Sequence, residues 1–239
     1  MKKKILIFIV SYNSSFRILN IINKLKKIDL SKDSYNILIS DDFSTDDTTK
    51  YIKKIKYSKK IKIILNKKNL GYGGNIKQCL KYALSKKYHY AIMIHGDDQY
   101  DVKYIPYISK NLKDQDVHIV TGSRMLNKGG ALNGKMPIYK FIGNIILTKF
   151  YNFIFNTKFS DCHTGLWGYN LSIFKRIKIS SIDEGYNFDN HLRIMASNRK
   201  MQIKEIPIKT FYRTETSSIH IMYSFNFIRY ILTNMFKKN

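Results

Sequence analysis

Short apolar runs, rich in β-branched residues, recur along the first half of the chain, and segments with a helical spacing of apolar residues separate them. Apolar strands that alternate with helices are typical of a parallel sheet covered on both faces. The pattern therefore predicts an α/β fold with a mostly parallel central sheet flanked by helices. The predicted strands are residues 4–10, 36–40, 61–65, 90–94 and 117–121.

The segment 74–87 carries the clearest helical pattern. Apolar residues at i, i+3, i+4, i+7 and i+8 form one stripe that a helix would bury. A cysteine in such a stripe usually packs in the core, and we interpret Cys79 in this way. The stripe consists of Ile76, Cys79, Leu80, Ala83 and Leu84.

The second half of the chain has a different composition. The glycine-containing segment MLNKGGALNGKMP, from residue 125, predicts a flexible loop that leads into a more helical part. We expect one large domain over residues 1–218 and an amphipathic helix over 219–239. That helix either lies at a membrane interface, as residues 138–155 also can, or packs on the domain or a partner subunit. Its narrow polar stripe, at spacings of 3, 4 and 4, is Asn226, Arg229, Thr233 and Lys237.

Basic residues greatly outnumber acidic ones. The 239 residues include 42 Lys or Arg and 17 Asp or Glu, which gives a formal charge of +25. Such a charge attracts nucleic acid, anionic lipid surfaces or phosphorylated substrates. Neither a recognition helix nor an aromatic RNA-binding strand pattern is present in the sequence, so we expect no nucleic acid partner. No stretch reaches ~18 consecutive apolar residues, so we expect any membrane contact to be peripheral.

The two cysteines, Cys79 and Cys162, lie far apart and have no CxxC spacing. We therefore expect neither a disulfide framework nor a cysteine zinc site, and a reducing cytosol fits. The N-terminal MKKKILIFIVSYN contains a short apolar run without a small-residue cleavage site after it. We interpret this run as the first strand rather than as a signal peptide.

Polar or glycine-rich segments follow each of the five predicted strands. In open α/β sheets, ligands bind at the carboxyl ends of the strands, so we expect these segments to form one site. The segment HGDDQYD has two adjacent carboxylates, and a structural turn needs only one. We therefore expect a cation or a metal at that strand end. The segments begin with VSYN at 10, DDFSTDDT at 41, NLGYGGN at 69, HGDDQYD at 95 and GSR at 122.

These segments, together with SDCHTGLWGY at 160, FD at 188, EIPI at 205 and YRTETSS at 212, resemble the inverting glycosyltransferases of family 2. Within that family they are most similar to the polyprenyl-phosphate (dolichyl-phosphate-type) sugar transferases. The resemblance runs from residue 4 to about 218. It implies a Rossmann-like nucleotide-diphospho-sugar transferase fold and a UDP- or GDP-sugar as donor.

The resemblance also implies a nucleotide site. By position, Asp42 contacts the base or the ribose, and Asp41 beside it is the alternative. Glycines in NLGYGGN let the backbone approach the nucleotide, and the helix that begins nearby directs its dipole toward phosphate. The implied nucleotide-sugar site comprises Ser11, Tyr12, Asn13, Asp41, Asp42, Asn69, Gly71, Gly74, Asp97, Arg124, Arg213 and Ser217.

The family normally carries D-x-D, often followed by Gln, which holds Mg²⁺ or Mn²⁺ against the diphosphate. The corresponding residues here are His95, Asp97 and Gln99, with histidine in place of the first aspartate. Because hard divalent cations prefer oxygen, we expect Asp97 to be the main ligand and Gln99 to assist. Three roles stay open for His95: a metal ligand, a donor to a ligand, or a diphosphate contact. We expect Asp98 to face solvent or to cap the turn.

Two acceptor classes stay open. A saccharide hydroxyl, as in surface polysaccharide or glycolipid assembly, needs a carboxylate base, for which Asp161 and Asp189 are the candidates. A polyprenyl phosphate is already an anion and needs positive charge and an apolar surface instead. The resemblance favours the polyprenyl phosphate, at the cytoplasmic face of the cell membrane, although Trp167 stands where the family has an arginine. The expected catalytic residues are Asp97, Arg124, Asp161 and Asp189, and a homo-oligomer stays open.

Overall fold

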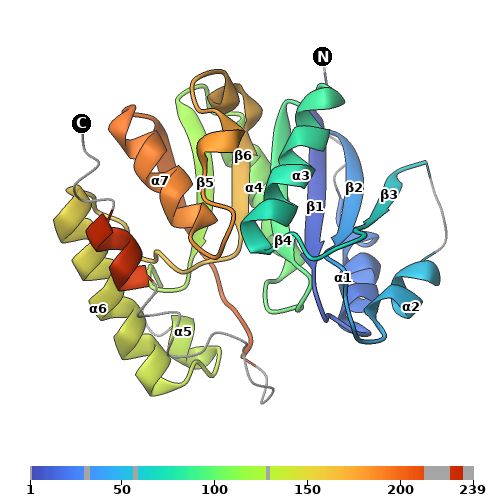
Figure 1. Ribbon diagram of the computed structural model, residues 1–239, viewed down its shortest axis with the longest axis horizontal. Helices are drawn as coiled ribbons and strands as arrows, with labels where there is room; N and C mark the ends of the chain where they lie inside the picture. Colours follow the sequence, from blue (N-terminus) through green and yellow to red (C-terminus); the bar gives the residue numbers. More distant parts are fainter. Residues whose placement is uncertain (1, 30–32, 56–58, 128–129, 213–226, 234–239) are drawn as a thin grey trace. The chain divides into compact units, whose positions relative to one another are not determined.

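The computed structural model contains a seven-stranded, mostly parallel sheet with helices packed on it, in the strand order β3-β2-β1-β4-β6-β5-β7 (Figure 1). All five predicted strands are confirmed, with ends within two residues of those expected. The strands are β1 (Lys4–Ser11), β2 (Ser34–Asp41), β3 (Ile61–Leu65), β4 (Tyr90–His95), β5 (Val117–Ser123), β6 (Trp167–Asn170) and β7 (Gln202–Pro207). The structure describes residues 2–29, 33–55, 59–127, 130–212 and 227–233.

Helices connect most of these strands. The α-helices are α1 (Arg17–Leu25), α2 (Thr48–Lys53), α3 (Tyr72–Ser85), α4 (Ile105–Leu112), α5 (Gly130–Asn133), α6 (Ile138–Phe155) and α7 (Phe188–Asn198). The predicted helix 74–87 corresponds to α3, which begins and ends two residues earlier. Its predicted stripe is buried except for Leu84, which is exposed. Short 3-10 helices are η1 (Val102–Tyr104), η2 (Leu171–Lys175) and η3 (Ile179–Ser181).

The register of the parallel strands aligns the segments that carry the candidate site. Strand β1 pairs in parallel with β2 and with β4, and Ser11 lies opposite Asp41 while Val10 lies opposite His95. The chain leaves these strands at one level, where the Asp42 N–H donates to the Ser11 carbonyl at 2.8 Å. Three of the predicted strand-end segments therefore begin side by side.

The antiparallel strand β6 was not predicted from the sequence. It pairs with β4 on one side and β5 on the other, and its four residues are too few to display a period of two. Trp167 and Tyr169 pack in the core formed with α3 and α7. Gly168, between them, faces the opposite side of the sheet, where a Cβ atom would lie 2.3 Å from Cγ2 of Ile108 on α4.

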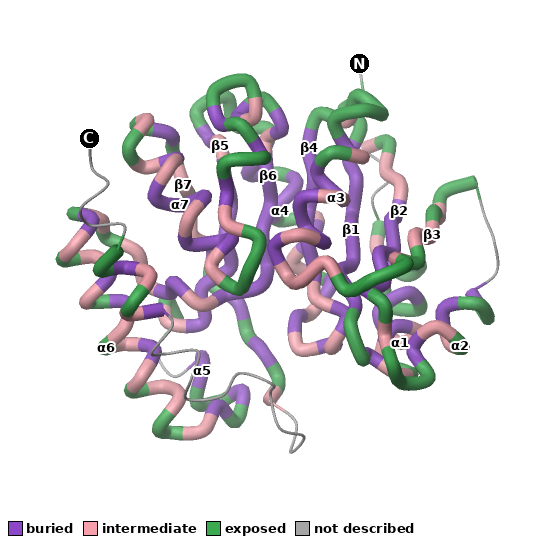
Figure 2. The backbone as a smooth tube through the Cα atoms, viewed as in Figure 1, coloured by how far each residue is buried: buried purple, intermediate pink, exposed green. Residues whose placement is uncertain are grey.

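The chain divides into two compact units; two of the three divisions fall within β5 and β7, and the third lies shortly before β6. The first unit comprises residues 1–121 and 165–204. Its core on one face of the sheet joins residues of β1, β4 and β6 to the inner sides of α3 and α7, and Cys79 is fully buried there, as interpreted. In Figure 2 the strands β1 and β4 are buried along most of their length.

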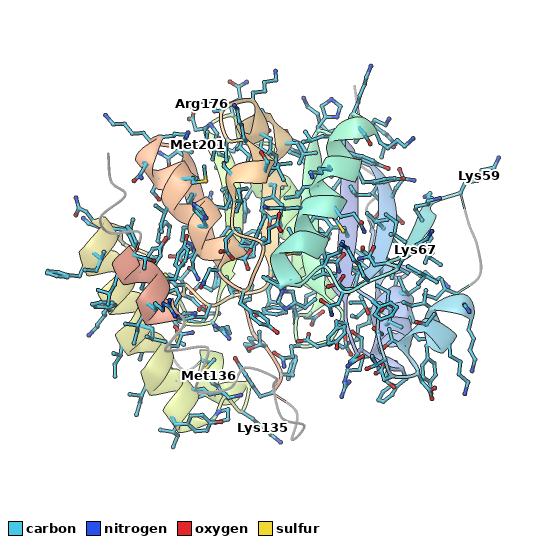
Figure 3. All side chains as sticks on the ribbon, viewed as in Figure 1. Lys59, Lys67, Lys135, Met136, Arg176 and Met201 are labelled. Carbon is cyan, nitrogen blue, oxygen red and sulfur yellow. The ribbon has the colours of Figure 1, made fainter. Side chains whose placement is uncertain are left out.

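The second unit comprises residues 122–164 and 205–239, as far as they are described. Helix α6 dominates it, and the buried ring of Tyr151 stacks on Phe227 with 6.2 Å between centroids. Lys135 and Met136, both labelled in Figure 3, precede α6; Lys135 is exposed and Met136 is buried. None of the helices described for this chain is both long and apolar enough to cross a membrane.

The predicted C-terminal helix can be followed only in part. Residues 227–233 are helical, and Arg229 and Thr233 of the predicted polar stripe lie on them. Asn226 and Lys237 lie outside the described residues, as do 219–225 and 234–239. The boundary at 218 thus stays a prediction.

We predict opposite effects on stability for two glycine substitutions. Gly168→Ala places a methyl group against Ile108 on α4 and is expected to lower the free energy of unfolding by about 1–3 kcal/mol. Gly143→Ala on α6 meets nothing within 4 Å and is expected to raise it by about 0.5–1 kcal/mol. Urea unfolding measures both. Unchanged stability of Gly168→Ala would contradict the packing of α4 on β6.

Candidate active site

Two adjacent carboxylates lie at the end of β2, Asp41 as its last residue and Asp42 directly after it, and their contacts differ. Asp41 is buried, and both of its oxygens accept hydrogen bonds from Ser44, at 2.5 Å from the hydroxyl and 3.1 Å from the N–H. Asp42 accepts at Oδ1 from the Asn66 amide at 3.0 Å and from the Leu70 N–H at 2.8 Å. Asp41 thus closes its own turn, and Asp42 holds the loop that leads into α3.

The segment after β1 is tied to this turn. The Asn13 side chain accepts from the Thr45 N–H at 2.9 Å, and the Asn13 N–H donates to the Ser44 hydroxyl at 2.9 Å. The buried Ser11 hydroxyl donates to Ser14 at 3.1 Å, whereas Tyr12 is 51 % exposed. Of the three residues predicted here, only Tyr12 has neither a buried side chain nor one held by these contacts.

The glycines at the start of α3 permit a backbone conformation and a close backbone contact that a side chain would prevent. Gly71 has φ +75°, a conformation that favours glycine, and its N–H donates to the Asn69 side chain at 2.8 Å. Gly73 permits a close approach, because a Cβ there would lie 2.7 Å from the Glu184 carbonyl oxygen. The Gly74 N–H donates to the same carbonyl at 3.0 Å. Gly73 thus permits a close approach of protein backbone, and the predicted approach of the nucleotide to Gly71 and Gly74 stays a prediction.

The two aspartates after β4 are also distinct. The expectation that Asp98 faces solvent is wrong: its side chain is fully buried and pairs with Lys24 of α1 at 2.6 Å. Its alternative role in capping the turn stays a prediction. A buried carboxylate needs such a partner. Asp97 is partly exposed and accepts from the Gln99 N–H at 3.1 Å. Asp97 is therefore the carboxylate that remains accessible at this strand end.

His95, the last residue of β4, is enclosed by other side chains. Its Nε2 lies 3.0 Å from the Tyr72 hydroxyl, and its ring meets Tyr72 and Tyr100 edge to face. Gly165 lies against the ring, since a Cβ at that position would be 2.2 Å from Cε1 of His95. The Gly165 N–H donates to the Tyr100 hydroxyl at 2.7 Å, which holds the backbone in place.

Tyr72 connects His95 to Asp189 at the start of α7. The tyrosine hydroxyl donates to Asp189 Oδ2 at 2.6 Å, while the buried Oδ1 has no hydrogen-bond partner. Burial raises the pKa of Asp189 to about 7, against the opposing effects of the Tyr72 hydrogen bond and the Arg193 charge. Burial, followed by the charge of Asp189, also raises the pKa of Tyr72 well above its usual value. The carboxyl of Asp189 can thus exchange a proton near neutral pH.

Trp167, which stands where an arginine was expected, is fully buried beneath another guanidinium. The Arg193 side chain, also fully buried, lies over the Trp167 ring at 4.9 Å from the centroid. A guanidinium stacked on an indole is a favourable cation–π arrangement. Position 167 therefore contributes an aromatic platform inside the first unit.

In the second unit, Arg124 and Asp161 form a buried ion pair. The guanidinium donates from Nε and Nη2 to the two Asp161 oxygens at 2.7 and 2.8 Å, and the Arg124 N–H adds a bond at 3.1 Å. The same guanidinium donates to the Tyr212 hydroxyl at 2.5 Å and to the His163 carbonyl at 2.8 Å. Asn144 of α6 donates to Asp161 at 3.0 Å.

This arrangement does not suit Asp161 as a general base. Burial by itself raises the pKa of Asp161, but the charge and hydrogen bonds of Arg124, with the bond from Asn144, outweigh burial and hold it well below the usual value. A carboxylate with so low a proton affinity accepts a proton poorly. Much of the Arg124 fork is likewise committed to protein acceptors rather than to a phosphate. The pair thus holds the second unit together, and the predicted phosphate contact of Arg124 stays a prediction.

The residues after β4 fit a divalent cation that binds together with the phosphates of a substrate. Among the described side chains, no group of three or more His, Cys, Asp or Glu could hold a metal by itself. Nε2 of His95 is engaged with Tyr72, which leaves the oxygens of Asp97 and Gln99. Mg²⁺ is usually bound by one or two carboxylates together with substrate phosphates and water. Asp97 and Gln99 match that pattern.

Comparison with known sequences decides the family. Residues 6–178 match the sequence profile described as glycosyl transferase family 2. The chain belongs to glycosyl transferase family 2. Membership makes it a glycosyltransferase and confirms the resemblance inferred from the strand-end segments.

This family 2 chain has named relatives. It is 28 % identical to the UDP-N-acetylglucosamine–dolichyl-phosphate N-acetylglucosaminyltransferase of Methanococcus voltae, over 98 % of each chain. It is 30 % identical to the dolichyl-phosphate β-glucosyltransferase of Saccharomyces cerevisiae, over 84 % of this chain and 65 % of that one. Its fold is similar to glucosyl-3-phosphoglycerate synthase of Mycobacterium tuberculosis with Mn²⁺ and UDP, at TM-score 0.65 and 12 % identity, over 99 % of this chain and 80 % of the other. The predicted Rossmann-like transferase fold is confirmed.

The family 2 motifs identified most of the segments that form the site, but not every residue that makes a key contact in them. Tyr72 and Gly165 were not singled out, although both lie inside quoted segments; a tyrosine within a glycine-rich turn was the available signal for Tyr72. Gly165 shows its importance only through its contact with His95. Arg213 and Ser217 lie outside the described residues, so their predicted phosphate contact stays a prediction.

We predict that Asp189→Asn stabilises the protein at pH 8 but not at pH 4. With a folded-state pKa of about 7 against 3.8, ionisation of Asp189 in the folded protein costs on the order of 4 kcal/mol. That cost is absent below pH 4, grows as the pH rises toward 7 and is complete above it. Thermal unfolding of wild type and variant at both pH values measures the difference.

Asp161→Asn serves as the contrast. It leaves the buried Arg124 without its counter-charge and is expected to cost about 3–5 kcal/mol at pH 8. Equal melting temperatures of wild type and Asp189→Asn at pH 8 would contradict the environment described for Asp189.

Proposed function

We propose that this protein is a metal-dependent, inverting glycosyltransferase that moves a sugar from a UDP- or GDP-sugar to a polyprenyl phosphate, at the cytoplasmic face of the membrane. The choice of a polyprenyl phosphate as acceptor rests on the exposed apolar side of α6, which lies in a strongly basic segment. The named acceptors of the relatives in Methanococcus voltae and Saccharomyces cerevisiae support the same class.

Helix α6 has an unusual distribution of polar and apolar residues. Asn144 and Thr148 are buried and hydrogen-bonded, at 3.1 Å to one another. Six side chains of α6 are exposed, and all but Lys149 are apolar or aromatic: Ile138 at 70 %, Tyr139 at 69 %, Ile142 at 50 %, Ile146 at 59 % and Phe153 at 83 %. An exposed apolar surface of this kind normally marks an interaction site.

The charge around α6 selects the partner. Residues 122–160 contain six Lys or Arg and no Asp or Glu, so an anionic surface would meet no repulsion there. The Lys140 ammonium lies over the Tyr139 ring at 6.0 Å, which keeps a cation beside the apolar face. Apolar side chains flanked by lysines suit the interface of an anionic lipid bilayer. We propose that α6 binds the membrane that holds the acceptor.

The donor is proposed to bind at the aligned ends of β1, β2 and β4. Asp42, which shapes the 66–70 loop, and the exposed Tyr12 are the candidate contacts to the nucleoside. Asp97 and Gln99 would hold Mg²⁺ or Mn²⁺, which supplies positive charge to the departing diphosphate. The fold neighbour bound to Mn²⁺ and UDP supports a divalent cation for this chemistry.

The reaction is proposed to be a single displacement. An oxygen of the acceptor phosphate attacks C1 of the sugar, and the bond from C1 to the nucleoside diphosphate breaks with its electron pair on the departing phosphate oxygen. Attack from the opposite side inverts the configuration at C1. An ionised phosphate oxygen needs no base for this step.

One observation favours the second acceptor class, a saccharide hydroxyl. A hydroxyl must lose its proton as it attacks, and Asp189, with a pKa of about 7 and an unpartnered buried oxygen, can accept one. Asp161 does not compete for this role, because Arg124 holds its pKa low.

A transfer assay tests the proposal. Full-length protein with a panel of labelled UDP- and GDP-sugars is expected to label a polyprenyl phosphate, and to label neither the corresponding polyprenol nor soluble saccharides. Removal of divalent cations, or Asp97→Asn, should reduce transfer at least a hundredfold, because the diphosphate loses its counter-charge. Asp116→Asn, an exposed carboxylate outside the site, is the matched control. Transfer to saccharides alone would replace the lipid acceptor with the hydroxyl alternative.

The α6 surface has its own test. Ile146→Ser combined with Phe153→Ser is expected to reduce flotation with anionic liposomes at least tenfold, since each side chain buried in lipid contributes about 1.5–3 kcal/mol. Nucleotide binding should not change. The control pair Leu84→Ser and Tyr107→Ser removes two exposed apolar residues of the first unit and should float like wild type. Equal flotation of all three proteins would exclude α6 as the membrane surface.

A further inference from the structure

A continuous chain of hydrogen-bonding groups runs through the first unit from β4 to α7. It links His95 Nε2 to the Tyr72 hydroxyl at 3.0 Å, and that hydroxyl to Asp189 Oδ2 at 2.6 Å. The Tyr72 hydroxyl has one proton, and burial keeps that proton on the oxygen. When Tyr72 donates to Asp189, its own oxygen is left to accept from His95.

The ring of Tyr72 is held on several sides. It meets the His95 ring edge to face at 5.4 Å and stacks on Tyr186 at 6.1 Å. The first turn of α3 is anchored by the Gly74 N–H, which donates to the Glu184 carbonyl at 3.0 Å, and by Gly73, which leaves no room for a side chain there. The hydroxyl is therefore held where it reaches both of its partners.

Asp189 is satisfied on one side only. The residue is 93 % buried. Oδ2 accepts a hydrogen bond from Tyr72, but the buried Oδ1 has no hydrogen-bond partner. An unsatisfied buried oxygen costs about 1–3 kcal/mol, which packing alone does not compensate. Such a cost is expected where a ligand supplies the missing group.

We propose that Tyr72 is a positioning residue for sugar transfer: by occupying Oδ2 of Asp189 and bridging to His95, it holds Oδ1 as the carboxyl oxygen presented to the acceptor. This inference rests on the proposed function. Toward a hydroxyl acceptor, Oδ1 accepts the proton; toward a phosphate acceptor, the protonated carboxyl donates a hydrogen bond. Tyr72 serves both cases, because it fixes the carboxyl in one orientation.

The groups around Asp189 determine its pKa, which a titration can measure. Tyr72 faces it from α3, Tyr169 from β6 and Arg193 from its own helix, while His95 acts through Tyr72. Of these, the Tyr72 hydrogen bond and the Arg193 charge favour the ionised carboxylate. Removal of the Tyr72 hydroxyl should therefore make Asp189 harder to ionise.

The central experiment is the carboxyl titration of Asp189, followed by NMR of the full-length protein with ¹³C-labelled aspartate and assigned with Asp189→Asn. Tyr72→Phe keeps the ring but removes the hydroxyl, and is expected to move the midpoint up by about one pH unit or more. Tyr82→Phe makes the same change on the same helix and should leave the midpoint at the wild-type value. An unmoved midpoint in Tyr72→Phe overturns the proposal.

Transfer kinetics give an independent readout. Tyr72→Phe is expected to lower kcat at least tenfold while KM for the nucleotide sugar stays unchanged. It should have little further effect in an Asp189→Asn background, because the two residues act as one unit. Additive losses would overturn the proposal.

If the wild type transfers sugar to neither acceptor class, the proposed function fails while the titration still decides the role of Tyr72 toward Asp189. If Tyr72→Phe does not fold, the ¹³Cζ resonance of Tyr72 in the wild-type protein replaces it. That resonance should shift with the midpoint of Asp189 and lose this shift in Asp189→Asn. A Tyr72 resonance that does not respond to Asp189 ionisation overturns the proposal.

Discussion

The in-register parallel pairing of β1 with β2 and β4 is the constraint on which the donor region depends. Strands β1 and β4 are buried along almost their whole length and β2 over its last five residues, so a slip in register would cost buried area on all three. With this register, Ser11, Asp41 and His95 end their strands at one level. The polar segments then start from a rigid edge, and the short hydrogen bonds between the Asn13 and Ser44 segments follow from that placement.

Two carboxylates of the same type illustrate how the environment separates function from structure. Asp161 and Asp189 are both buried, but Asp161 receives a forked guanidinium while Asp189 receives a single tyrosine hydroxyl. The first stays ionised and inert over the physiological range, and the second titrates near pH 7. A buried carboxylate whose oxygens are all hydrogen-bonded stabilises the fold. One with an unbonded oxygen costs stability but can still exchange a proton or bind a ligand.

The second unit shows a related division of polar and apolar groups. Helix α6 buries Asn144 and Thr148, because Asn144 donates a hydrogen bond to Asp161 and the Thr148 hydroxyl accepts one from the Cys162 N–H. Apart from Lys149, the exposed side chains of the helix are isoleucine and aromatic residues. The same 18 residues thus supply an internal polar network and an external apolar surface.

The sequence alone was enough to predict the α/β class, five of the strands, helix α3 and the family, because short apolar runs and strand-end motifs are local signals. It also identified Asp97, which remains accessible, and the two carboxylates that were candidates for a base. Only the tertiary structure separated Asp161 from Asp189, buried Asp98 against Lys24 and brought Tyr72 between His95 and Asp189. These outcomes depend on contacts between residues as many as 117 positions apart, and on burial, which sets the proton affinity of a carboxyl group. Neither these long-range contacts nor the burial of a side chain can be read from the local spacing of residues, because both arise only when the chain packs.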